Sequence, residues 1–136
     1  MNRPIMRDVL FLGQKSEEAT RADEQVIVDM KDTLQAHRDG CVGMAANMIG
    51  FKKRIIIVSM GVGDLIMVNP VLKSHAKSYQ TEEGCLSLVG VRPVTRYEQI
   101  EVEYLDEDWV SHRPTYTGYV AQIIQHEMDH LEGIII

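Results

Sequence analysis

The sequence is short of cationic side chains and of long apolar runs. Lysine and arginine together number 14 against 20 aspartates and glutamates, which gives a formal net charge of −6. Binding to phosphates requires clustered lysine and arginine, so a nucleic acid partner is not expected. The longest apolar stretches, at residues 55–58 and 134–136, cannot span a bilayer, and the N-terminus has no apolar run of signal-peptide length. These absences predict a cytoplasmic protein without a membrane partner.

Cysteine is also scarce, because Cys41 and Cys85 are the two examples in 136 residues. In a reducing compartment we expect two such thiols to be free or metal-bound and not joined in a disulfide. An apolar content of 45% is nevertheless sufficient for one domain, residues 1–136, to bury a core without disulfides or oligomerisation.

Two helices are predicted. From Ser16 onward, apolar residues recur at intervals of three and four with charged residues between them, and Gly40 follows where a helix would end. This spacing predicts a long amphipathic N-terminal helix. The last helix is predicted to begin after an N-cap at Thr117 and to end at Gly133.

Strands are predicted where β-branched residues are dense or where apolar and polar residues alternate. Residues 54–60 and 65–68 show the first pattern, with a glycine-containing hairpin turn at 61–64 between them. Residues 100–104 alternate apolar side chains with glutamates, which is typical of a half-buried antiparallel strand. The predicted fold class is α+β, with antiparallel strands packed around the final helix.

That final helix contains the pattern HExxH at residues 126–130. Four residues are close to one helical turn, so His126 and His130 are expected on the same face, with Glu127 beside them. Two imidazoles and a neighbouring carboxylate are typical of a metal site in which the carboxylate holds a metal-bound water. The pattern therefore predicts two metal ligands and requires a third.

The third ligand is expected upstream of this helix. Zinc proteases usually take it from further along the chain, but no suitable residue follows His130, and Glu132 is too close on the same helix to turn back. Five upstream residues have suitable side chains: His37, Cys41, His75, Cys85 and His112. Cys85 is the preferred candidate because it follows Gly84 in an otherwise extended stretch, and Cys41 is the second choice.

Two stretches resemble motifs of one family. EGCLS at residues 83–87 and QHEMDHLEG at residues 125–133 are similar to motifs of the peptide deformylases, metalloenzymes that remove the formyl group from the N-terminal methionine of nascent peptides. A further motif of that family, GxGxAAxQ, corresponds to CVGMAANM at residues 41–48. Here Cys41 stands at the first glycine and Met48 at the glutamine.

The ligand set Cys85, His126 and His130 leaves a fourth tetrahedral position for water, as in catalytic sites. Glu127 would accept a proton from that water as general base, and the reaction class is amide hydrolysis. The donor types alone favour Zn²⁺, whereas the resemblance implies Fe²⁺, and Ni²⁺ or Co²⁺ are further candidates for the isolated protein.

The resemblance also implies the substrate and its contacts. N-formyl-Met peptides would be bound by the backbones of Val42, Gly43 and Leu86, and the Leu86 amide would stabilise the oxyanion together with the family's glutamine side chain. Met48 cannot donate a hydrogen bond, so we expect a slow deformylase unless Asn47 or a water supplies the missing donor. Ribosome docking through a C-terminal helix is not expected, because the sequence ends soon after the metal motif.

Two other functions match parts of the pattern. A non-catalytic metal-containing module could bind formylated or N-terminal peptides without hydrolysing them. Met48 favours that alternative, whereas Glu127 opposes it, because a binding module needs no general base. A zinc endopeptidase fits less well, since the ligand order and a cysteine ligand are unusual for that class. A deformylase-like hydrolase is therefore the leading hypothesis.

Overall fold

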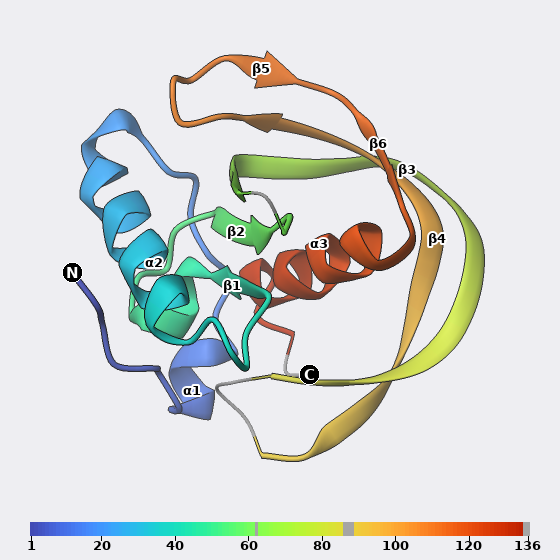
Figure 1. The fold of residues 1–136 in the computed structure, drawn as a ribbon, viewed down its shortest axis with the longest axis horizontal. Helices are drawn as coiled ribbons and strands as arrows, with labels where there is room; N and C mark the ends of the chain where they lie inside the picture. The colour runs from blue at the N-terminus through green and yellow to red at the C-terminus, as the bar shows by residue number, and fades with distance from the viewer. Residues whose placement is uncertain (62, 86–88, 135–136) are drawn as a thin grey trace.

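The computed structural model describes residues 1–61, 63–85 and 89–134. These residues form an α+β fold with an antiparallel sheet, as predicted (Figure 1). The sheet order is β1-β2-β3-β4-β5, and β6 also pairs with β4. The strands span Gly43–Ala45 (β1), Ile55–Ser59 (β2), Asp64–Gly84 (β3), Val91–Leu105 (β4), Ser111–His112 (β5) and Thr115–Thr117 (β6).

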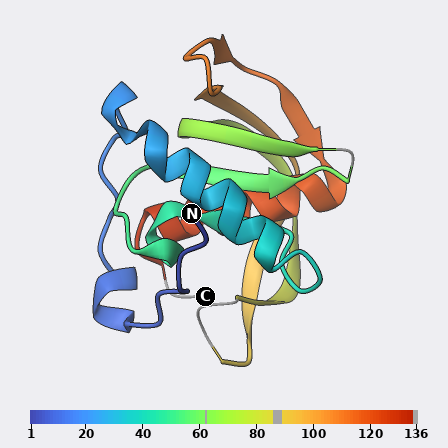
Figure 2. The ribbon, with the colours of Figure 1, turned by 60° about the vertical axis from the view of Figure 1, so that its left-hand side comes forward.

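The described helical segments are of two kinds. The α-helices span Val9–Leu12 (α1), Glu24–Ala36 (α2) and Gly118–Leu131 (α3), and the 3₁₀ turns span Arg21–Asp23 (η1) and Ala46–Ile49 (η2). Figure 2 shows α2 in front of β2, with α3 behind it, and both helices contact β1 and β2. The long strands β3 and β4 curve around α3 (Figure 1). These layers place one face of α3 against the sheet.

The N-terminal helix is shorter than predicted. It was expected from Ser16, but α2 begins at Glu24, after the 3₁₀ turn that Thr20 caps through its side chain. The preceding residues are extended because their backbone N–H groups form hydrogen bonds with distant segments instead of within a helix. The Glu17 N–H donates to the Lys52 carbonyl at 2.9 Å, and the Ala19 N–H donates to the Asn69 side chain at 2.8 Å. These tertiary hydrogen bonds outweigh the helical spacing of the apolar residues.

Strand β3 is longer than predicted. The sequence pattern predicts a strand that ends at residue 68, before Asn69 and Pro70, whereas β3 continues to Gly84. Register shifts against β4 between Val68 and Val71 accommodate the interruption, and Asn69 has a positive φ of 52°. A bulge at this point tolerates a proline that cannot donate to the ladder.

Helix α3 lies in the core. Thr117 is its N-cap with an extended backbone, although its side chain makes no capping hydrogen bond. Eight residues of the helix are buried: Ala121, Ile123, Ile124, Gln125, His126, Glu127, His130 and Leu131. Gly133 follows with a φ of 76°, and a Cβ atom there would lie 2.5 Å from the Gly13 carbonyl oxygen. None of the helices in the described ranges has the length and apolar character that crossing a bilayer requires.

Candidate active site

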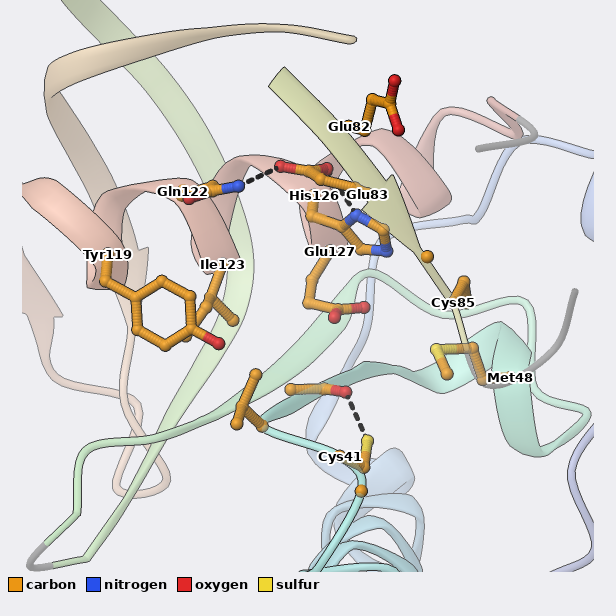
Figure 3. Close-up of a pocket in the computed structure, with 14 residues that line it drawn as sticks. Cys41, Met48, Glu82, Glu83, Cys85, Tyr119, Gln122, Ile123, His126 and Glu127 are labelled. Carbon is orange, nitrogen blue, oxygen red and sulfur yellow. Dashed lines mark hydrogen bonds and ion pairs between the residues drawn. The ribbon is translucent and has the colours of Figure 1, made fainter. Parts of the chain in front are cut away.

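A cavity of about 300 Å³ lies where β1, the end of β3 and one face of α3 meet (Figure 3). The sheet contributes one wall and the helix another. The lining residues are Gly40, Cys41, Val42, Gly43 and Met48, then Glu82, Glu83, Gly84 and Cys85, and finally Tyr119, Gln122, Ile123, His126 and Glu127. Three segments that are distant in sequence therefore converge here.

Three potential metal donors lie together, and two of them, Cys85 and His126, line this cavity. One donor atom from each of Cys85, His126 and His130 lies within 4.8 Å of the other two. The Nε2 atoms of the two histidines are 3.1 Å apart, because both rings project from one face of α3. A thiol and two imidazoles are a donor set that suits Zn²⁺ and related divalent ions, so these three residues could hold a metal.

The other candidate ligands have different environments. The His37 amide caps the C-terminus of α2, His75 stacks on Tyr97, and His112 pairs with Asp106. The Cys41 sulfur lies 2.9 Å from the Gly43 carbonyl oxygen, outside the donor group. Burial raises the pKa of the Cys41 thiol to about 11, so it stays protonated at neutral pH. Both cysteines are free, as expected.

A buried network of ion pairs contacts His126 at its Nδ1 atom. The Nδ1 atom of His126 lies 2.7 Å from the Glu83 carboxylate, which also accepts from Arg96 at 2.6 Å and from Gln122 at 2.9 Å. Arg96 is 4% exposed and donates in turn to Asp129 at 2.6 Å. A carboxylate on the second ring nitrogen fixes the orientation of a ligating histidine. The network therefore connects β3, β4 and α3 around the candidate metal site.

Sequence reasoning assigned no role to Glu83, Arg96 or Asp129. A signal was available for Glu83, because residues two apart on a strand face the same side, and Glu83 precedes Cys85 by two. A ligating histidine also needs a partner for its second nitrogen. Arg96 carries no comparable local signal, since its proximity to Glu83 depends on the register between β3 and β4.

The pKa values of this network are displaced in opposite directions. Burial alone would raise the pKa of Glu83, but hydrogen bonds from His126, Arg96 and Gln122 outweigh it and lower the pKa to about 2. Burial lowers the pKa of His126, yet hydrogen bonds to Cys85 and Glu83 raise it to about 10. Burial and the positive charges of His126 and Arg96 lower the pKa of His130 to about 3. A metal ion would therefore have to displace a proton from His126.

Glu127 is a buried carboxylate beside the donor group. It is 5% exposed, and its Oε1 atom has no hydrogen-bond partner among the described residues. Burial raises its pKa to about 7, and the negative charge of Glu83 adds to this rise. Figure 3 shows its carboxylate pointing into the cavity, between His126 and Cys41. A base whose pKa lies near neutrality and that faces a cavity is suited to proton transfer.

Gly43 allows β1 to approach α3 closely. A Cβ atom at this position would lie 2.7 Å from Ile123 Cγ2 and 3.0 Å from Glu127 Oε2. Strand β1 pairs with β2, and the Ser59 N–H donates to the Val42 carbonyl at 2.8 Å. Because antiparallel bonding alternates along a strand, the Gly43 N–H and carbonyl point away from β2. The backbone of β1 therefore presents polar groups beside Glu127.

Met48 lines the cavity but supplies no donor. It is 1% exposed, and its sulfur accepts a hydrogen bond from the Ala45 N–H at 3.4 Å. Asn47 is directed elsewhere, because its side-chain amide donates to the His130 carbonyl at 2.9 Å. Leu86, the other expected oxyanion donor, lies outside the described residues. The structure thus brings Met48, Val42 and Gly43 to the same cavity as Glu127 and turns Asn47 away from it.

Two histidines one helical turn apart, a cysteine and a buried glutamate lie together at or beside one cavity, which is the arrangement of an enzyme active site that could hold a metal. A family model described as polypeptide deformylase matches residues 3–136. The chain belongs to the polypeptide deformylase family, which confirms the resemblance found in the sequence motifs.

Individual relatives agree with this assignment. A peptide deformylase of Clostridium beijerinckii is 57% identical over 136 residues, which cover all of both chains. The crystal structure of a peptide deformylase from Legionella pneumophila superposes with a TM-score of 0.90 at 30% identity, covering 99% of this chain and 83% of that one. That of a Synechococcus elongatus peptide deformylase in complex with actinonin gives 0.87 at 33% identity, covering 98% and 75%.

Proposed function

We propose that this protein removes the formyl group from the N-terminal methionine of nascent peptides, acting as one domain in the cytoplasm. The observation that carries the proposal is Glu127, a buried carboxylate without a partner among the described residues, facing a cavity beside three metal donors. A binding module would gain nothing from burying such a group, because an unpaired buried carboxylate destabilises the fold. Membership of the deformylase family supports formyl-Met peptides as the substrate.

Cys85, His126 and His130 would hold one divalent ion. The family resemblance favours Fe²⁺, whereas a thiol with two imidazoles is also suited to Zn²⁺, Ni²⁺ or Co²⁺. When bound, the ion would act as a Lewis acid and lower the pKa of water, so that hydroxide is available to attack an amide carbonyl near neutral pH.

The side chains supply proton transfer and orientation. Glu127 accepts a proton from the attacking water and passes it to the departing amine, so that a C–O bond forms, the C–N bond breaks, and formate and a free N-terminus result. The Gly43 N–H, which points away from β2, would bind the peptide backbone along β1, and Val42 would line the same path. Glu83 and Arg96 keep the His126 ring oriented through its second nitrogen. The Leu86 amide is proposed as an oxyanion donor.

The proposal is tested by assaying purified, anaerobically prepared protein on a formyl-Met peptide and measuring formate release. Turnover that requires added divalent metal supports it. Tight binding of the formyl peptide without formate release, in protein that contains its metal, would instead indicate the non-catalytic binding module. Met48 is the feature that favours this second candidate, because it leaves the cavity without the side-chain donor that the family motif places there.

Exchange of the proposed thiol ligand should remove the metal. Cys85→Ser replaces a soft thiolate with a weakly acidic hydroxyl. Loss of a residue that only hydrogen-bonds to a metal ligand already lowers metal affinity about 10–100-fold. We therefore expect the purified variant, which loses a ligand itself, to retain less than about a tenth of the wild-type metal content. Cys41→Ser is the matched control, because Cys41 lies in the same cavity outside the donor group. Elemental analysis that shows the opposite order would identify Cys41 as the ligand.

Restoring a donor at position 48 should accelerate the reaction. In Met48→Gln, the amide oxygen can accept the Ala45 N–H in place of the sulfur, which leaves the amide N–H₂ free to donate into the cavity. Losing one oxyanion donor lowers turnover by about 10²–10³-fold, so we expect kcat on a formyl-Met peptide to rise at least about tenfold. KM should change less, because the donor acts on charge that develops in the transition state.

Met48→Leu is the control for this substitution, since leucine neither accepts nor donates and the variant should remain slow. A Met48→Gln protein no faster than wild type would contradict the missing-donor argument. That result would point to a cavity shaped for a ligand other than the transition state of deformylation.

A further inference from the structure

Asn47 is a buried polar residue in an apolar turn. It is 0% exposed, and it lies in η2 among Ala45, Ala46, Met48 and Ile49, all of which are buried. Its Oδ1 atom is buried and has no hydrogen-bond partner among the described residues. An unsatisfied buried carbonyl oxygen destabilises a fold, and such groups in native proteins usually have a specific purpose. Asparagine at this position therefore needs a reason other than stability.

The other end of the Asn47 amide makes one long-range contact. Its Nδ2 donates at 2.9 Å to the carbonyl oxygen of His130, which is 83 positions away in sequence. The same carbonyl accepts the Gly133 N–H at 3.1 Å, so the last turn of α3 is formed without Asn47. The bond instead joins the segment that contains β1 and Met48, which line the cavity, to the backbone of the candidate metal ligand His130.

The turn that carries Asn47 has further backbone supports. The Met48 carbonyl accepts from the Met6 N–H at 2.7 Å, and the Ala46 carbonyl accepts from the Phe51 N–H at 3.1 Å. These bonds do not involve the Asn47 side chain. Removal of its amide should therefore leave the turn folded and release its connection to α3 alone.

We propose that Asn47 is a positioning residue that holds the wall formed by β1 and η2 at a fixed distance from His130. A peptide bound along the Gly43 backbone would then have its formyl carbonyl at a fixed position relative to Glu127 and the metal donors. The catalytic part of this inference rests on the proposed function. Small displacements of a bound substrate relative to the reacting groups lower turnover strongly, even when affinity is retained.

The test is Asn47→Leu, which keeps the number and branching of the side-chain heavy atoms and removes both the donor and the unsatisfied oxygen. We expect kcat on a formyl-Met peptide to fall at least tenfold, KM to stay within threefold of wild type, and Tm to remain unchanged or rise. A loss of Tm in parallel with the loss of activity would assign Asn47 an ordinary structural role and overturn the proposal. A kcat within threefold of wild type would overturn it equally.

Ser16→Ala is the matched control. The Ser16 hydroxyl is likewise buried without a partner among the described residues, and its backbone N–H donates at 2.8 Å to the neighbouring carbonyl, that of Leu131. Alanine keeps that backbone bond, so this variant removes an unsatisfied oxygen at the same end of α3 without removing a connection. Its kcat should equal that of wild type.

A second measurement does not depend on turnover. The visible absorption bands of Co²⁺ report the geometry of its ligands, so Co²⁺-loaded Asn47→Leu should show shifted bands and weaker Co²⁺ retention, whereas Ser16→Ala should match wild type. If wild type binds Co²⁺ but releases no formate, the proposed function fails, and the Co²⁺ comparison still decides the positioning role. Wild-type-like bands and retention would then overturn it.

The double variant Asn47→Leu/Met48→Gln separates positioning from direct oxyanion stabilisation. If Asn47 acts by position, glutamine at residue 48 cannot compensate, and the tenfold deficit relative to Met48→Gln persists. Recovery of the Met48→Gln rate in the double variant would show that Asn47 itself donates to the substrate, and would overturn the proposal.

Discussion

Glu127→Gln is expected to lower turnover of a formyl-Met peptide by about 10³-fold, within the range of 10²–10⁴ that general base catalysis contributes. Glutamine keeps the shape of the side chain and loses its basicity. The metal content should equal that of wild type, because the three donor residues are unchanged. Near wild-type formate release by this variant would rule out Glu127 as the base.

The same residue predicts the direction of the pH dependence. Its carboxyl group accepts a proton only when ionised, so kcat/KM should rise with pH through the pKa and then level off. Burial places that pKa at about 7, and a bound cation would lower it. The acidic limb should therefore lie at or below pH 7. Glu132→Gln is the control, because this partly exposed glutamate of the same chain segment pairs with Arg54 at the surface and should leave the profile unchanged.

Glu83→Gln is expected to weaken both the fold and the metal site. It leaves Arg96, which is 4% exposed, with Asp129 as its remaining carboxylate partner, and breaking a buried ion pair destabilises a protein by about 3–5 kcal/mol. It also removes the carboxylate from His126, for which we expect a 10–100-fold loss of metal affinity. Chemical denaturation of the metal-free proteins and competition with a chelator measure the two effects.

The stability difference between wild type and Glu83→Gln should depend on pH with a known sign. The folded-state pKa of Glu83 is about 2, below the ordinary value of 4.5, so the ionised group contributes stability above pH 4.5. This contribution is lost as the pH falls toward 2, and the two proteins should then converge. A difference that stays constant down to pH 2 would contradict the role of the Glu83 charge.

The network around Glu83 shows which part of the site was readable from local sequence. HExxH places two imidazoles together through helical geometry alone, since residues four apart share a face. Glu83 precedes Cys85 by two residues in a stretch predicted to be extended, and the same kind of rule places them on one side, although β3 ends at Gly84 between them. The pairing of β3 with β4 places Arg92 opposite Glu83 and Arg96 opposite Tyr79, so the Arg96 side chain contacts Glu83 from a position four residues away from its cross-strand partner. No spacing within either strand encodes this contact.

The extents of the elements were also decided by tertiary contacts. Periodicity predicted a helix from Ser16 and a strand that ended at residue 68. Hydrogen bonds of Glu17 and Ala19 to distant segments keep the first stretch extended, and a bulge carries β3 past Pro70. Propensity is a weak preference that such contacts override.

By itself, the sequence determined the α+β class, the family, and the grouping of His126, Glu127 and His130, because each depends on local periodicity or on contiguous motifs. Tertiary structure alone decided the partners of those residues. The Asn47 side chain was an alternative oxyanion donor by its position beside Met48, yet its amide is bonded to the His130 carbonyl. The direction of a buried polar side chain depends on which distant acceptor the packed fold brings within hydrogen-bonding distance, and that acceptor is specified by the whole chain.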